Sequence, residues 1–134
     1  MLRVRAREPL MAAALADILY HGRRAYVYTP FLGRSAAALI AKVLGEAGGG
    51  SVTLFASRVG PGGALEPLRR LGGVTVCAPA GGAWAGSFAY SEGGYAAYLP
   101  VPLSASLYSK GGGFVVVWPR APSWLASFLS ELSC

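Results

Sequence analysis

The sequence contains no asparagine and no glutamine, and it has one aspartate, one histidine and two cysteines in 134 residues. A nucleophile triad needs a base and an orienting acid, and His21 is the only histidine that the chain offers as a base. A structural zinc site needs about four cysteine or histidine ligands, which is more than the whole chain contains. These deficits argue against an enzyme, and we expect no catalytic residue, no metal site and no cofactor.

The missing amides also indicate a habitat. Asparagine and glutamine are heat-labile, and their depletion is typical of proteins from hot environments, so the composition predicts a thermophile protein. Arginine outnumbers lysine ten to two. A GC-rich genome, which favours arginine, alanine and glycine, is the alternative explanation for the same bias.

Cysteines and long apolar runs are equally scarce. Two cysteines are too few for a disulfide scaffold, so we expect Cys77 and Cys134 to be thiols, with Cys77 in the core. The alternative is a link through Cys134, if the host tolerates intracellular disulfides. Residues 71–91 are uncharged, but glycines and prolines interrupt them, so they do not form a membrane helix of about 20 residues. Residues 1–7 lack the apolar core of a secretory signal. We expect a cytoplasmic protein without a membrane partner.

Hydrophobic residues make up 54% of the chain and charged residues 13%, which predicts one folded domain over residues 1–134. Strand patterns and helix patterns alternate along it. The strand patterns lie at residues 2–7, 25–29, 51–57, 74–78, 87–90, 95–99 and 114–118. The helix patterns lie at residues 9–21, 35–45, 65–71 and from 122 onward. Ser35 is the predicted cap of the second of these helices. Because strand, helix and strand follow with short connections, we predict an α/β fold with a mostly parallel central sheet, helices on both faces and a C-terminal hairpin.

The order of these elements resembles one half of the phospholipase-D-like fold over nearly the whole chain. Three segments carry the resemblance. They are a strand ending in Thr29-Pro30-Phe31, the strands SVTLF and VTVCA with a helix between them, and the hairpin followed by LSASLYS, the strand FVVVW and a final helix. The resemblance implies that fold for this chain. It also implies a homodimer, because single-domain members of the family pair two halves.

The motif that defines the family's chemistry is missing. That motif has a histidine nucleophile, a lysine two residues later and an acidic residue five further on, followed by a Gly-Ser-x-Asn turn. Laid on this sequence, those places fall near Gly86, Phe88, Gly93 and residues 99–102, and none of these residues supplies the chemistry. The resemblance therefore implies a degenerate, non-catalytic member.

The formal net charge of +6 suits a polyanionic partner such as nucleic acid. Arginines at alternate positions of the first strand share one face, where they suit a phosphate backbone, and tyrosines of the hairpin offer rings on which bases stack. The predicted residues are Arg3, Arg5, Arg7, Tyr90, Tyr95 and Tyr98. Without asparagine or glutamine, such binding is expected to be largely sequence-tolerant. The alternative is an edge strand protected from aggregation, with aromatic pairs in the core.

A second candidate site lies where two predicted parallel strands end. Ligands of open α/β sheets bind beyond the carboxyl ends of the strands, and a helix start there favours anions. The predicted anion site consists of Thr29, Arg34, Ser35, Ser57 and Arg58. The alternative is an ordinary helix entry.

Three hypotheses follow. The first is a non-catalytic binding or assembly module that binds nucleic acid and forms a homodimer. The second is a small-ligand sensor or a phosphoryl-transfer enzyme that uses the anion site. The third is a structural subunit of a protein complex, whose charge serves solubility alone.

Overall fold

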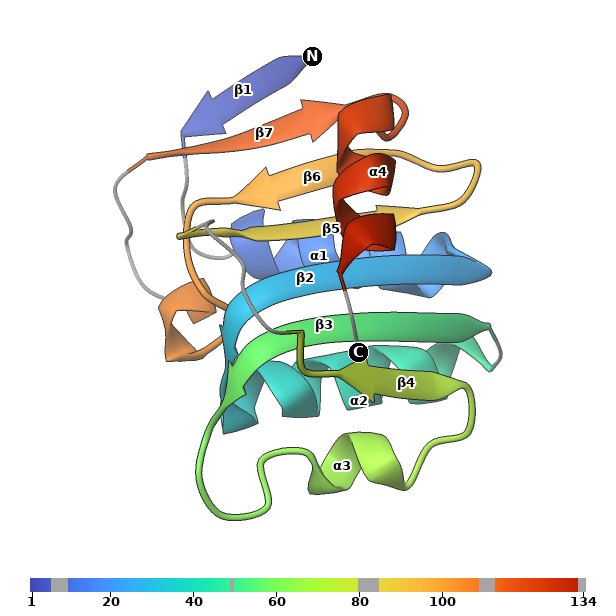
Figure 1. The fold of residues 1–134 in the computed structure, drawn as a ribbon, viewed down its shortest axis with the longest axis vertical. Coiled ribbons are helices and arrows are strands. Elements are labelled where there is room, and N and C mark those ends of the chain that lie inside the picture. The colour runs from blue at the N-terminus through green and yellow to red at the C-terminus, as the bar shows by residue number, and fades with distance from the viewer. Residues whose placement is uncertain (6–9, 49, 80–84, 109–112, 133–134) are drawn as a thin grey trace.

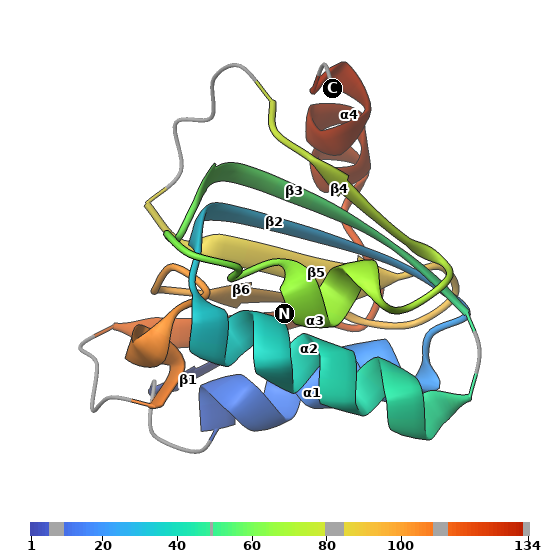
Figure 2. The same cartoon turned by 90° about the horizontal axis from the view of Figure 1, so that it is seen from below.

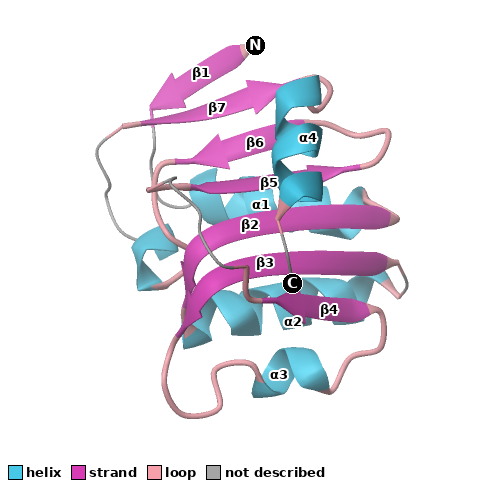
Figure 3. Cartoon of the chain, viewed as in Figure 1, coloured by secondary structure: helices cyan, strands magenta, loops and turns pink. Residues whose placement is uncertain are grey.

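The computed structural model describes residues 1–5, 10–48, 50–79, 85–108 and 113–132. Its seven strands form one sheet in the order β1-β7-β6-β5-β2-β3-β4. The helices α1, α2 and α3 cover one face of this sheet, and α4 lies on the other (Figures 1 and 2). We call these the three-helix face and the α4 face. Figure 3 shows the same layers coloured by element type.

One half of the sheet is built from parallel strands. Its elements are β2 (Arg24–Leu32), α2 (Arg34–Ala47), β3 (Ser51–Val59), α3 (Glu66–Arg69) and β4 (Val74–Cys77). β2 pairs with β3 and β3 pairs with β4, both in parallel. The connections run through α2 and α3, as parallel neighbours require. The βαβ pattern predicted from the sequence is therefore present in this half.

The other half of the sheet is antiparallel. Its strands are β5 (Ser87–Ser91), β6 (Ala96–Leu99), β7 (Phe114–Trp118) and β1 (Leu2–Arg5). Every pair that involves one of these strands, including the pair of β5 with β2, is antiparallel. The prediction of a mostly parallel sheet is wrong. A short turn over residues 92–94 joins β5 to β6, and so short a connection reverses the chain and forces antiparallel pairing.

The remaining helices are α1 (Leu10–His21), the 3-10 helix η1 (Ala105–Tyr108) and α4 (Ser123–Glu131). None of the helices in the described part of the chain is long and apolar enough to cross a membrane. Helix α2 begins at Arg34, and its N-cap is Gly33, two residues before the predicted cap Ser35. Alternation along the strands sends small aliphatic residues to the three-helix face and aromatic residues to the α4 face. The sheet therefore separates two cores.

Cys77 belongs to the core beneath α4, as predicted, and its side chain is only 3% exposed. The prediction that it is a free thiol is wrong, because Cys77 is disulfide-bonded. The chain's other cysteine, Cys134, lies outside the described residues.

Candidate functional sites

The strand register decides which of the predicted nucleic-acid-binding residues share a surface. Arg3 lies opposite Val116 and Arg5 opposite Phe114, and Val116 in turn lies opposite Tyr98. Directly opposed residues of antiparallel strands point to the same face of the sheet. Arg3 and Arg5 therefore lie on the α4 face, the same face as Tyr98. Arg7 lies outside the described residues.

Exposed aromatic rings accompany these two arginines. The Arg3 guanidinium carbon lies 4.9 Å from the centroid of the Phe114 ring, which is the geometry of a cation–π contact. The Phe114 side chain is 43% exposed, and Trp124 of α4, whose ring centroid is 5.9 Å from that of Trp118, is 45% exposed. We call this surface the arginine–aromatic strip. It consists of Arg3, Arg5, Phe114, Trp118 and Trp124.

The three predicted tyrosines contribute little to this strip. Tyr90 is 9% exposed and stacks on Tyr26 at a centroid distance of 5.1 Å, so its ring is already covered. Tyr98 is half-buried, and its ring lies 5.0 Å from that of Phe88. Tyr95 packs against the core of the three-helix face, on the opposite side of the sheet. We therefore exclude Tyr90 and Tyr95 from the proposed binding surface.

Tyr95 instead joins the β5–β6 hairpin to α1. Its hydroxyl donates a hydrogen bond of 2.5 Å to the Asp17 carboxylate, whose other oxygen lies 3.3 Å from His21 Nε2. Burial, and then the hydrogen bond and charge of Asp17, raise the pKa of Tyr95 above its ordinary value of 10.0. The folded state thus holds the phenolic proton more tightly than the unfolded chain does.

We expect this proton to make stability fall at alkaline pH. The contribution of Tyr95 is fully present below about pH 10, where the unfolded tyrosine is protonated, and it is lost as pH rises toward the raised pKa. Guanidinium unfolding curves between pH 8 and about pH 11 should give a shallower decline for Tyr95→Phe than for the wild type. Part of the slope remains, because the pKa values of Tyr26 and Tyr90 are also raised. Tyr20→Phe, at a side chain that is 49% exposed, is the control and should keep the wild-type slope.

Thr29, the first residue of the predicted anion site, is buried inside the fold. Its side chain has no exposed surface, and its hydroxyl donates to the carbonyl of Phe31 at 2.8 Å. It accepts from the Leu103 backbone N–H at 3.0 Å, and the Ser87 hydroxyl lies 3.1 Å away. The Ser87 hydroxyl also donates to the carbonyl of Val101 at 2.8 Å. Thr29 therefore ties β2, β5 and the segment before η1 together and is not accessible to a ligand.

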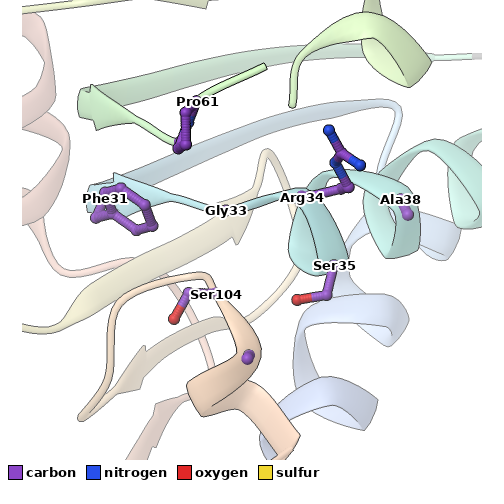
Figure 4. Close-up of a pocket in the computed structure, with 9 residues that line it drawn as sticks. Phe31, Gly33, Arg34, Ser35, Ala38, Pro61 and Ser104 are labelled. Atoms are coloured by element: carbon purple, nitrogen blue, oxygen red, sulfur yellow. The ribbon is translucent and has the colours of Figure 1, made fainter. Parts of the chain in front are cut away.

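Arg34 and Ser35 do share a site, a cavity at the carboxyl ends of β2 and β3. The cavity has a volume of about 670 Å³. It is lined by Phe31, Gly33, Arg34, Ser35, Ala38, Gly60, Pro61, Ser104 and Ala105. Figure 4 shows Phe31 and Pro61 at one end of the cavity and the start of α2, with Arg34 and Ser35, at the other.

Besides Thr29, two more residues of the predicted anion site lie outside this cavity. Ser57 lies beyond Ala56, which faces the three-helix core, so strand alternation directs Ser57 toward the α4 face. Its hydroxyl is buried without a hydrogen-bond partner. Arg58 is exposed and does not line the cavity. The structure therefore brings together only Arg34 and Ser35, and it adds the apolar walls that the sequence did not indicate.

Two places of the missing catalytic motif, at Gly86 and Phe88, are closed. A Cβ atom on Gly86 would lie 2.4 Å from the Tyr98 hydroxyl oxygen and 2.5 Å from the Leu99 carbonyl oxygen. Phe88 is 2% exposed in the core beneath α4. No side chain larger than hydrogen fits at Gly86 without a shift of the backbone around it.

Within the described ranges, no three histidine, cysteine, aspartate or glutamate side chains gather as a metal site requires. No protein-family model matches the chain, and no curated protein matches it at significant similarity.

Proposed function

We propose that this chain is a non-catalytic module that binds single-stranded nucleic acid, with little sequence preference, on the arginine–aromatic strip. The observation that carries the proposal is the pairing of Arg3 and Arg5 with the exposed ring of Phe114 on one open part of the sheet. Proteins that bind single strands combine cations along the backbone with rings on which bases stack. The strip supplies both groups on neighbouring strands.

The charges of the strip favour an external anion. The ion pairs among the described residues join His21 to Asp17 and Arg70 to Glu66, so no carboxylate in the described part of the chain neutralises Arg3 or Arg5. Side chains two residues apart on a strand lie about 7 Å apart on one face. That spacing is comparable to the distance between neighbouring phosphates of an extended strand. The spacing of both guanidinium groups therefore suits contact with one backbone.

The open edge of β1 offers another use, as a pairing edge for a second copy of the chain, but its charges oppose this. Antiparallel pairing about a two-fold axis perpendicular to the sheet would place the arginines of β1 directly opposite the arginines of the second copy. Opposed like charges destabilise strand pairing. The arginines thus protect this edge from self-association and leave it available to a polyanion.

The experiment is fluorescence anisotropy of a labelled single-stranded oligonucleotide across a salt series. Each arginine–phosphate contact contributes about 0.7 to the slope of log affinity against log salt on a single strand, so R3A/R5A should lower that slope by about 1.4. We expect its affinity at physiological salt to fall by roughly tenfold or more. Phe114→Ala should weaken binding by about 1–3 kcal/mol without changing the slope, because it removes stacking and no charge.

The matched control is R23A/R69A, which removes the same charge from two exposed arginines outside the strip. Its affinity should stay within about twofold of the wild type, because distant surface charges are screened at physiological salt. Equal losses in the two double variants would show non-specific attraction by net charge and would contradict the strip. Absence of binding by the wild type at low salt would reject the module altogether.

The non-catalytic part of the proposal is supported by Gly86 and Phe88, where the phospholipase-D-like motif requires histidine and lysine. Membership of that family, and the homodimer that it implies, rest on the sequence resemblance and stay part of the proposal. The arginines of β1 disfavour its edge as the dimer interface.

A further inference from the structure

The cavity beside α2 has the size and the walls of a small-molecule site. Its volume of about 670 Å³ falls within the range of about 300–1,000 Å³ that ligand pockets occupy. Apart from Arg34 and two serines, its lining is apolar or glycine. Phe31 is half-buried, so part of its ring surface remains available to a ligand. A flat apolar group fits such walls.

The backbone around the cavity is held in place by hydrogen bonds. The N–H of Gly33 donates to the carbonyl of Leu103 at 2.8 Å, which joins the start of α2 to the segment before η1. The N–H of Gly60 donates to the carbonyl of Leu32 at 2.8 Å, which joins the β3–α3 loop to β2. The cavity is therefore preformed, and a ligand does not have to order it.

The polar groups of the cavity favour an anion. Arg34 donates through Nη2 to the carbonyl of Gly62, which holds the guanidinium in position while its other N–H groups stay available. No acidic residue lines the cavity or stands in the first turn of α2. The first turn of α2 has no side-chain cap, so its free N–H groups and the helix dipole add to the positive potential at this end. The serine hydroxyls differ in availability, because Ser104 is engaged with Ser106.

We propose that this cavity binds a small molecule that joins a flat apolar body to one anionic group. The apolar body lies between Phe31 and Pro61, and the anionic group meets the guanidinium of Arg34 at the start of α2. An aromatic phosphate, sulfonate or carboxylate has this chemistry. A nucleotide is disfavoured, because its ribose hydroxyls and base edges would find few polar partners on these walls. The site is separate from the arginine–aromatic strip and does not depend on it.

The test uses anilinonaphthalene sulfonate, a fluorescent aromatic anion, and phenylnaphthylamine, its neutral counterpart. Arg34→Ala should weaken sulfonate binding by roughly tenfold, because it removes a charge-assisted hydrogen bond, and should leave the neutral probe unchanged. Arg58→Ala, at the exposed arginine outside the cavity, should bind both probes as the wild type does. Ala38→Phe, from an exposed position on α2 that lines the cavity, should reduce binding of both probes.

Competition distinguishes the ligand class. Phenyl phosphate should displace the sulfonate probe at concentrations where inorganic phosphate does not, because only the aryl ester fills the apolar part of the cavity. Equal losses in Arg34→Ala and Arg58→Ala, or wild-type binding by both Arg34→Ala and Ala38→Phe, would overturn the proposal. R3A/R5A should bind both probes normally, so failure of the strip and failure of the cavity are distinguishable.

Discussion

Thr29→Val is expected to lower the free energy of unfolding by about 2–4 kcal/mol. Valine keeps the shape of threonine but removes the oxygen that accepts from the Leu103 N–H at 3.0 Å and donates to the Phe31 carbonyl at 2.8 Å. Thr29 is fully buried, so water does not replace these bonds. Leaving a buried donor without an acceptor costs about 1–3 kcal/mol, and here a carbonyl loses its partner too. Guanidinium unfolding followed by circular dichroism measures the loss.

The matched control is Thr75→Val on the edge strand β4. Thr75 is exposed, so the same change of side chain should alter stability by no more than about 0.5 kcal/mol. Thr29→Ser keeps the hydroxyl and should retain most of the stability that Thr29→Val loses. If Thr29→Val proves as stable as Thr75→Val, the buried hydroxyl network does not hold the carboxyl end of β2 to its neighbours.

Gly86→Ala is expected to cost about 3 kcal/mol, toward the upper end of the usual range for overpacking. The added methyl group would lie 2.4 Å from the Tyr98 hydroxyl oxygen and 2.5 Å from the carbonyl oxygen of Leu99. The tyrosine ring can rotate away, but the carbonyl belongs to β6 and moves only if the strand moves. A shift of β6 disturbs its pairing with β5, so the penalty reaches the middle of the sheet.

Gly45→Ala provides a control of the opposite sign. Gly45 lies in α2, and a Cβ atom there meets no heavy atom within 4 Å. Alanine in a helix is favoured over glycine by about 0.5–1 kcal/mol, so this variant should be more stable than the wild type. The same unfolding measurement compares the two variants. A neutral Gly86→Ala would mean that the place of the family's histidine is not closed.

Local patterns in the sequence predicted the elements well, because strand and helix periodicity depend on neighbouring residues. The strand at residues 114–118 and the parallel pairs β2–β3 and β3–β4 follow from such patterns. The order of the strands does not, since it depends on contacts between distant segments. No local signal places β5 antiparallel beside β2, and this pair, together with β5–β6, β6–β7 and β1–β7, makes most of the sheet antiparallel.

The contrast between local patterns and distant contacts also explains which residues of the candidate sites the sequence predicted. The alternation of Arg3 and Arg5 is local, and both share a face as predicted. Phe114 joins them only because β7 pairs with β1, more than a hundred residues away in sequence, so the sequence alone did not indicate it. Tyr95 and Tyr98 are three residues apart, and strand alternation already places them on opposite faces. The sequence alone therefore already indicated that Tyr95 and Tyr98 do not share a binding surface.

The most direct test of the arginine–aromatic strip is a titration of the isotope-labelled protein with a short single-stranded oligonucleotide, followed by amide chemical shifts. We expect progressive shifts for residues 2–5 of β1 and 114–118 of β7, with little change along α1 and α2. Such a result would place the nucleic acid on the open part of the α4 face. Shifts confined to the cavity around Arg34, or no shifts at low salt, would contradict the proposed function.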